Sequence, residues 1–209
     1  MIQTLFIVLS VLLSLVSIGL TLRLNRINQA FSEYRIWAEN EIERVSRTDT
    51  GTGALKNSAF NDLLSSECRR AVREFTPLTL MKLDMKHLNG DDPSDDEMHQ
   101  VAQILKERLS RPGDQLGRCG QNQLCLLLPS TNEHAGVFAN VCHQAVNDAF
   151  TSSDVQFTLA ACTFQPTASL TPEMASEMVN ETLVKALSEK PGEVLFHAEY
   201  SHDFNPMYT

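Results

Sequence analysis

Hydrophobic and polar positions divide the 209-residue chain into an apolar start, an amphipathic stretch and an alternating remainder. Residues 2–22 form an uncharged run rich in Leu, Ile and Val. At about 1.5 Å per residue, a helix of this length crosses the hydrocarbon core of a bilayer. Over residues 25–47, apolar side chains recur at helical spacing without Gly or Pro, which predicts an amphipathic helix. We therefore expect a transmembrane helix followed by a linking helix.

The flanks of the apolar run indicate an anchor and not a cleaved signal peptide. No basic residue precedes the run, and no small-residue cleavage site follows it. Arg23 and Arg26 come directly after it, so the positive-inside rule places the rest of the chain in the cytoplasm. We predict a single-pass anchor over residues 1–24. The linking helix, residues 25–47, either pairs with its copy as a short coiled coil, which would make a homodimer, or packs on its own domain.

Beyond the Gly- and Thr-rich stretch TDTGTGAL, the pattern alternates between helices and strands. The expected helices cover residues 58–75, 95–109, 132–149 and 172–188. The expected strands cover 78–84, a hairpin over 115–128, 157–164 and 193–197. This order predicts an α/β sandwich with a five-stranded central sheet over residues 48–199, followed by a tail at 200–209.

Charge and cysteine content exclude two classes of function. The net charge is −9 and the pI is about 5.1, so the chain has no basic stripe for nucleic-acid binding. The five cysteines have no zinc-site spacing, and we expect free thiols in a reducing compartment. Cys119 and Cys125 could face each other across the hairpin, but small core residues are favoured over a redox pair there.

Three segments resemble the GGDEF domain of diguanylate cyclases, which join two GTP molecules into cyclic di-GMP. DTGTGALKNSAF, starting at Asp49, is similar to the family's D-x-L-T-G-L-x-N-R-x-x-F. LTLMKLDMKHL is similar to the strand that carries the family's metal-binding acids, with Asp84 as the first acid. RPGDQLGRCGQNQLCLLLP aligns without a gap to R-x-x-D-x-x-x-R-x-G-G-D-E-F-x-x-L-L-P. The resemblance extends to about Glu199 and implies the GGDEF fold.

The chain departs from this family at the residues that would perform catalysis. The signature motif is replaced by Gly120, Gln121, Asn122, Gln123 and Leu124. The resemblance implies that the acid at position 122 would hold Mg²⁺ together with Asp84 and that the acid at position 123 would assist the attacking hydroxyl, whereas amides supply no charge. Lys86 stands at the second metal-binding acid, and the phosphate-binding lysine falls on Leu187. We therefore expect a degenerate domain with no catalytic residue, no metal and no cofactor, in which Asp84 is a vestigial metal position.

One binding motif of the family is retained. R-x-x-D before the signature motif forms the family's inhibitory cyclic di-GMP site, and here it is Arg111 and Asp114. A guanidinium can bind phosphate or a guanine edge, and a carboxylate can accept from guanine N–H groups. The partner arginine of many family members falls on Val141. The sequence RPGD also favours a turn for purely structural reasons, without any ligand. Ligand binding and pure scaffolding therefore stay equal alternatives.

The resemblance implies a function in signalling. Non-catalytic members commonly serve biofilm, exopolysaccharide or adhesion machinery. We expect a cyclic di-GMP-responsive regulator or assembly subunit in the bacterial inner membrane, with its C-terminal domain in the cytoplasm. Its protein partner would belong to secretion, polysaccharide or adhesion machinery. The alternatives are a protein-binding scaffold without nucleotide and an active cyclase with a divergent motif.

Overall fold

The structure is a computed structural model that divides the chain into two compact units, Met1–Ser46 and Arg47–Thr209. It describes residues 23–25, 28–29, 31–32, 34–35, 41, 46–131, 134–151 and 153–198. The described residues between 23 and 41 are helical, and most of the predicted linking helix lies outside the described residues. The predicted membrane-spanning run, residues 2–22, and the tail, residues 200–209, lie outside the described residues. Within the described part, no helix is long and apolar enough to cross a membrane.

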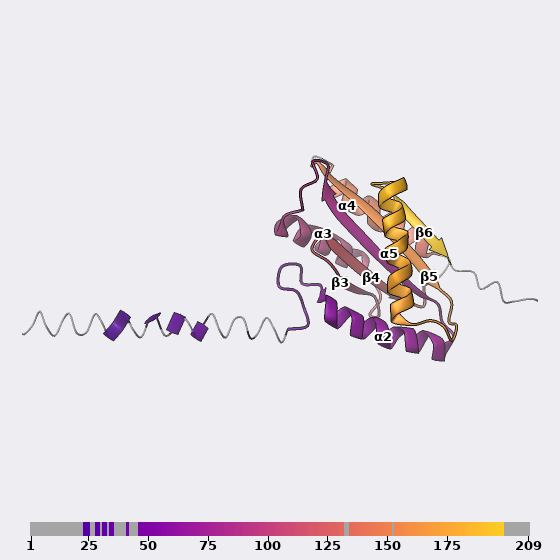
Figure 1. The fold of residues 1–209 in the computed structure, drawn as a ribbon, viewed down its shortest axis with the longest axis horizontal. Helices are drawn as coiled ribbons and strands as arrows, with labels where there is room; N and C mark the ends of the chain where they lie inside the picture. The colour runs from indigo at the N-terminus through magenta and orange to yellow at the C-terminus, as the bar shows by residue number, and fades with distance from the viewer. Residues whose placement is uncertain are drawn as a thin grey trace, which may run out of the picture. The chain divides into compact units, whose positions relative to one another are not determined.

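The second unit alternates strands and helices, as the sequence predicts (Figure 1). Its elements are, in chain order, β1 (Leu55–Lys56), α2 (Asn57–Glu74), β2 (Leu78–His87), α3 (Asp95–Arg108), β3 (Gln115–Arg118), β4 (Gln123–Pro129), α4 (Ala135–Ala149), β5 (Val155–Phe164), α5 (Pro172–Glu189) and β6 (Val194–Ala198).

The strands form one mixed sheet in the order β1-β3-β4-β2-β5-β6. The long strand β2 is central and pairs antiparallel with both β4 and β5. The outer strands β1 and β6 pair in parallel with β3 and β5. The described sheet therefore has six strands, and the prediction of five was wrong. The missed strand is Leu55–Lys56, which is too short to show an alternating pattern and follows a Gly- and Thr-rich turn.

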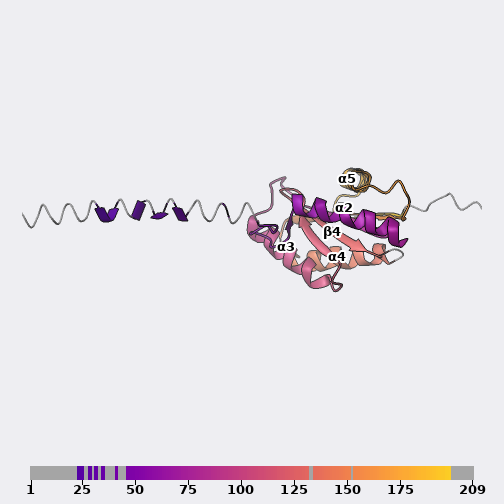
Figure 2. The same ribbon diagram turned by 90° about the horizontal axis from the view of Figure 1, so that it is seen from below.

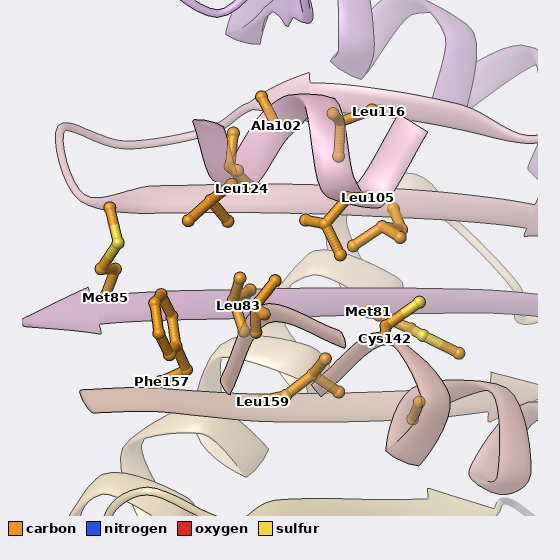
Figure 3. Close-up of a cluster of buried hydrophobic side chains, with 14 of the residues drawn as sticks. Met81, Leu83, Met85, Ala102, Leu105, Leu116, Leu124, Cys142, Phe157 and Leu159 are labelled. Carbon is orange, nitrogen blue, oxygen red and sulfur yellow. The ribbon is translucent and has the colours of Figure 1, made fainter. Parts of the chain in front are cut away.

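Helices cover both faces of the sheet, with α2 and α5 on one face and α3 and α4 on the other (Figure 2). Alternate residues of β2 supply the two cores. Met81, Leu83 and Met85 are buried toward α3 and α4 (Figure 3), whereas Leu80 is buried toward α2 and α5. Because both faces are covered, the first part of the central strand, residues 78–81, is buried on both faces. Its last residues, beyond Leu83, carry the polar side chains of the candidate site.

A capping box fixes the start of α3, which follows the loop beside that site. The Ser94 hydroxyl accepts from the Glu97 N–H at 3.3 Å, and Glu97 Oε2 accepts from the Ser94 N–H at 2.8 Å. Asp95, Asp96 and Glu97 occupy the first turn, where negative charge interacts favourably with the helix dipole. The loop from Leu88 to Pro93 is thus held between the end of β2 and a fixed helix start.

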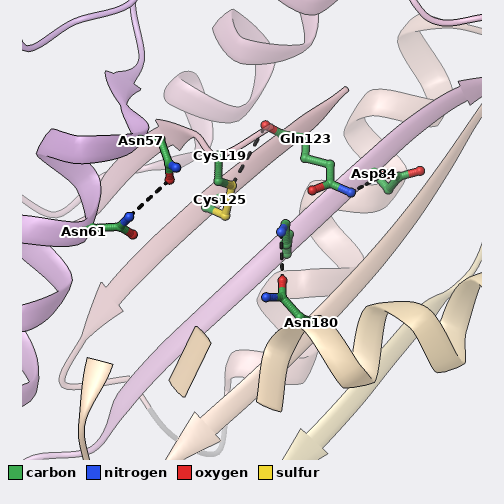
Figure 4. The surroundings of a disulfide bond; sticks show 8 residues. Asn57, Asn61, Asp84, Cys119, Gln123, Cys125 and Asn180 are labelled. Carbon is green, nitrogen blue, oxygen red and sulfur yellow. Dashed lines mark hydrogen bonds between the residues drawn. A yellow bond between two sulfur atoms is a disulfide. The ribbon is translucent and has the colours of Figure 1, made fainter. Parts of the chain in front are cut away.

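A disulfide joins the strands of the hairpin, which corrects the expectation that every cysteine is a free thiol (Figure 4). Cys119 and Cys125 are six residues apart, with 6.0 Å between their Cα atoms. Gly117 pairs with Cys125, so the hairpin register places Cys119 diagonally opposite Cys125, within the Cα separation that a disulfide requires. Cys68, Cys142 and Cys162 are free and buried, as expected.

Candidate functional site

The pairing of β2 with β4 brings the vestigial metal position to the replaced signature motif. Asp84 pairs directly with Gln123, so their side chains lie next to each other on one face of the sheet. Gln123 Nε2 donates a hydrogen bond to Asp84 Oδ1 at 2.8 Å (Figure 4). The structure therefore brings Gln123 to Asp84, with an amide donor directed at the carboxylate, whereas the resemblance placed position 122 beside Asp84.

The other amides of the turn contact Asp92, in the loop between β2 and α3. Asn122 Nδ2 donates to Asp92 Oδ1, and Gln121 Nε2 donates to Asp92 Oδ2 at 3.4 Å. The Met85 N–H donates to the Asn122 carbonyl at 3.0 Å, which continues the ladder between the strands. Among the described residues, Asn122 Oδ1 is buried and has no hydrogen-bond partner. Each of the two acids, Asp84 and Asp92, thus accepts from amide N–H groups.

The electrostatics at Asp84 disfavour the ionised carboxylate. Burial raises the pKa of Asp84, and the hydrogen bond from Gln123 and the charges of Lys86 and Lys82 offset only part of this rise. Burial also lowers the pKa of the neighbouring Lys82. Desolvation shifts the pKa of each group toward its neutral form, because moving a charge out of water is costly, and the charge of Asp84 opposes this shift at Lys82. A carboxylate that holds a metal ion has the opposite preference.

The residues present do not fit a magnesium ion. Mg²⁺ prefers an octahedron of oxygen ligands and usually takes one or two carboxylates. Here Gln123 supplies an N–H toward Asp84, and Lys86 adds a positive charge near it. Across the described ranges, no group of three or more His, Cys, Asp or Glu side chains could hold a metal ion. The amides therefore occupy the place where the resemblance would put the metal.

Arg118 joins the turn to the loop at the start of the domain. Its guanidinium donates to Asp49 Oδ1 at 3.3 Å and to the Gln121 carbonyl at 3.2 Å. Asp49 Oδ1 also accepts from the Thr52 N–H at 2.9 Å and the Thr52 hydroxyl at 2.7 Å. Burial alone would raise the pKa of Asp49, but the hydrogen bonds from Thr52 and the charge of Arg118 outweigh it, so this pKa is lowered.

Arg118 and Asp92 are not among the site residues that the sequence predicts. Arg118 lies inside the matched motif, and its fixed spacing before the turn is a signal that could have identified it. Asp92 lies in a run of acids that has no metal-site spacing, so the sequence contains no signal for its contact with Asn122.

Arg111 and Asp114 lie in one turn at the other end of the hairpin, just before β3. The Asp114 N–H donates to the Arg111 carbonyl at 3.0 Å, and Asp114 Oδ2 accepts from the Arg111 N–H at 3.2 Å. The exposed Arg111 guanidinium donates to the Thr131 hydroxyl at 3.4 Å, not to Asp114. Burial raises the pKa of Asp114, while the Arg111 N–H and charge act against this rise. The turn thus presents a solvent-facing guanidinium beside a half-buried carboxylate.

The position of the missing partner arginine is exposed on α4. Val141 has 44% of its surface exposed, and it offers no hydrogen-bond donor to a ligand. Any anionic ligand at this turn would therefore be bound by Arg111 without a second guanidinium from this position.

Comparison with known proteins identifies relatives of the domain. The model of the family described as "Diguanylate cyclase, GGDEF domain" matches residues 46–190. No curated protein sequence matches the chain.

Several solved structures share the fold at low sequence identity. The coiled coil and GGDEF domain of DgcB from Caulobacter crescentus, in complex with c-di-GMP, is 17% identical, with a TM-score of 0.65 over 82% of this chain and 97% of that one. The GGDEF domain of FimX from Pseudomonas aeruginosa is 15% identical, with a TM-score of 0.61 over 73% of this chain and 100% of that one. The diguanylate cyclase SiaD with its activator SiaC, also from Pseudomonas aeruginosa, is 18% identical, with a TM-score of 0.62 over 84% and 71%. At these identities the likeness establishes the fold alone.

Proposed function

This chain belongs to the GGDEF domain family, and from that premise we propose that its domain is a non-catalytic, cyclic di-GMP-responsive regulator or assembly subunit. The hydrogen bond from Gln123 Nε2 to Asp84 Oδ1, at 2.8 Å, is the observation that carries the proposal. It directs an N–H donor at the carboxylate that transfer chemistry on GTP would require as a metal ligand.

Three further features support the absence of catalysis. Asn122 directs its N–H toward Asp92, so neither amide of the turn presents a charged oxygen to a triphosphate. Lys86 stands on β2 at the second metal-binding position of the family motif. Leu187, at the expected phosphate lysine, is 39% exposed and has no donor. Phosphoryl transfer needs positive charge around the phosphates and a metal ion bound to them. Leu187 supplies no charge for the phosphates, and the amides and Lys86 supply no charged ligand for the metal.

The turn at Arg111 and Asp114 supports a ligand-binding role. The guanidinium is exposed, and its one described side-chain partner is a neutral hydroxyl at 3.4 Å, so it can be recruited by an anionic ligand at little cost. Asp114 keeps one carboxylate oxygen on the Arg111 N–H, which leaves acceptor capacity for guanine donors. The related DgcB structure contains c-di-GMP, which makes this dinucleotide the first ligand to test.

The rest of the proposal concerns assembly. We place residues 1–24 in the bacterial inner membrane as a single-pass anchor, with residues 25–47 as a linking helix that can pair two copies and the domain in the cytoplasm. We expect a protein partner in secretion, exopolysaccharide, biofilm or adhesion machinery. The related diguanylate cyclase SiaD forms a complex with an activator protein, which supports the search for a protein partner of this chain.

Calorimetric titration of the full-length chain in mild detergent tests the ligand. We expect cyclic di-GMP to bind with a micromolar or weaker Kd, because the second arginine is missing. A hydrogen bond to a charged group contributes roughly 1.5–3 kcal/mol. Arg111→Ala should therefore weaken binding by about tenfold or more, at about 1.4 kcal/mol per decade.

Two further variants separate the site from the replaced motif. Asp114→Asn should also weaken binding, because it removes the charge but keeps an acceptor for the Arg111 N–H. Asn122→Ala is the control at the other end of the hairpin and should leave the Kd unchanged. If wild type and Arg111→Ala bind cyclic di-GMP equally, the ligand site does not use Arg111 and this assignment is wrong. If neither protein binds, the domain is a scaffold without nucleotide.

A further inference from the structure

The disulfide is accessible from the surface of the domain. Cys119 and Cys125 line a groove of about 230 Å³ between α2 and α5, whose other lining residues are Asn57, Phe60, Asn61, Leu80, Lys82, Ser176, Val179 and Asn180. Cys119 is half-buried, whereas Cys125 is only 5% exposed. Figure 4 shows the two sulfur atoms between the amides of α2 and Asn180 of α5. A small thiol that enters the groove would therefore reach the sulfur of Cys119 first.

Lys82 lines the same groove as the second sulfur. Lys82 pairs with Cys125 across β2 and β4, so both side chains point to the same face of the sheet. Side chains paired in this way have Cβ atoms about 4.5–5.5 Å apart. Lys82 Nζ donates to Asn180 Oδ1 at 2.8 Å, which holds the ammonium over the groove. A cation next to a thiol stabilises its thiolate and makes that thiolate a better leaving group.

We propose that Cys119 and Cys125 form a thiol–disulfide exchange site, at which small thiols and dithiols attack Cys119 and Lys82 stabilises the departing Cys125 thiolate. The attacking thiolate forms a bond to Cys119 Sγ, and the bond between the two cysteine sulfurs breaks with its electron pair on Cys125. The second thiol of the dithiol then attacks the first sulfur of the same dithiol, which is bonded to Cys119 in the mixed disulfide, and releases the Cys119 thiolate. The cysteine pair gains two electrons and two protons, and the dithiol leaves as a cyclic disulfide.

Exchange at this site would act on the replaced signature motif. Residues 120–124 lie between the two cysteines, and this segment holds the amides that contact Asp84 and Asp92. The disulfide limits this turn to few conformations. Reduction removes that covalent constraint and lets the turn adopt more of them. Disulfides in a reducing cytoplasm are usually transient and redox-sensing, which suits the compartment proposed above. The exchange chemistry itself depends on the groove and on Lys82, and not on any role in cyclic di-GMP binding.

Differential alkylation of the full-length chain in mild detergent tests the site. The oxidised protein is treated with dithiothreitol without denaturant, quenched with iodoacetamide and digested for mass spectrometry. We expect Cys119 and Cys125 to be alkylated together, while Cys68, Cys142 and Cys162 stay unmodified because they are buried. Burial also raises the pKa of Cys68 to about 11 and that of Cys142 to about 12, so these thiols form little thiolate.

Variants at two lysines of β2 test the chemistry. A nearby cation shifts the pKa of an acid by about one unit or more. Exchange rates change by roughly half a decade per unit of thiol pKa, so Lys82→Gln should slow reduction by about threefold or more. Lys82→Arg keeps the charge, so its disulfide should be reduced at nearly the wild-type rate. Lys86→Gln is the matched control, because Lys86 is exposed on the same strand and pairs with Gln156 instead of a cysteine.

Three results would overturn the proposal. The first is an oxidised protein in which Cys119 and Cys125 are already alkylated without reductant. The second is a linkage that opens only after denaturant is added, which is the behaviour of a sealed structural disulfide. The third is a Lys82→Gln variant that is reduced as fast as wild type and Lys86→Gln, which would remove the lysine from the chemistry.

Discussion

Replacing Gln123 by glutamate would reverse the polarity of the central contact in the candidate site. The substitution keeps the side-chain size but exchanges the N–H that now donates to Asp84 Oδ1 for a second carboxylate oxygen. Losing a hydrogen bond to a charged group costs roughly 1.5–3 kcal/mol. Two like charges about 4 Å apart add at most about 4 kcal/mol at an effective dielectric constant near 20. Because the pair is partly exposed, we expect Gln123→Glu to lower the free energy of unfolding by about 3 kcal/mol at pH 8.

The size of this loss should depend on pH. Burial already raises the folded-state pKa of Asp84 above its unfolded value, and a second carboxylate beside it would raise one pKa of the pair further. Above that raised pKa both acids are ionised and repel each other, so the full loss is present. Below it the two acids share a proton and form a hydrogen bond, so the loss shrinks. The difference in stability between variant and wild type should therefore fall from about pH 8 toward about pH 5.

Thermal unfolding of the full-length chain, followed by circular dichroism with a chelator present, measures the effect. For a domain of this size about 1 kcal/mol corresponds to roughly 2–4 °C in Tm, so the expected drop is about 6–12 °C at pH 8. The double variant Asp84→Asn with Gln123→Glu again pairs one amide with one carboxylate and should recover most of that drop. Gln121→Glu, whose amide lies 3.4 Å from Asp92 on the exposed side of the turn, is the matched control and should cost far less.

Two outcomes would refute this reasoning. If Gln123→Glu unfolds at the wild-type temperature at pH 8, or if the double variant does not recover, the contact with Asp84 does not hold the turn. If Mg²⁺ restores the stability of Gln123→Glu more than that of wild type, a single acid is enough to recreate a metal site. The proposal of a non-catalytic domain would then lose its main support.

Two further predictions concern packing and catalysis. A Cβ on Gly117 would lie only 2.7 Å from Phe60 Cγ, so Gly117→Ala should lower the free energy of unfolding by about 1–3 kcal/mol. Gly113→Ala is the control and should unfold like wild type, because a Cβ there has its nearest contact at 3.6 Å, to Pro129. Wild-type protein incubated with GTP and Mg²⁺ or Mn²⁺ should give no cyclic di-GMP by mass spectrometry, and a product that disappears in Asp84→Ala would instead establish an active cyclase.

Local signals in the sequence predicted most helices and strands. The strand residues that these signals missed depend on pairing with other strands. The start of α3 was predicted at residue 95 and lies at Asp95, since capping and dipole effects are local. The strand β2 continues past its predicted end at Asp84 to His87, because pairing with β5 compensates for polar side chains. The strand Leu55–Lys56 exists only through its parallel pairing with β3, which no pattern of two residues can indicate.

The candidate site was predicted in part. The resemblance implied that an acid at position 122 would join Asp84, whereas in the structure Gln123 pairs with Asp84 and Asn122 contacts Asp92. The disulfide was set aside because composition favoured free thiols, yet the hairpin register decides whether Cys119 and Cys125 can meet. The position of Lys82 beside Cys125 depends in the same way on which strands become neighbours. Such contacts require the tertiary fold and are not encoded in any spacing along the chain.

The same cross-strand contacts explain how the turn keeps its form without acids. In a catalytic turn, carboxylates that face one another at the end of β2 need a cation between them, because unpaired like charges repel. Here the turn supplies N–H donors to Asp84 and Asp92, and these hydrogen bonds satisfy the acids within the protein. With amides in place of acids, the turn has no facing carboxylates whose repulsion a cation would have to offset. We infer that the replaced motif stabilises a domain that no longer depends on nucleotide and metal for the order of its central turn.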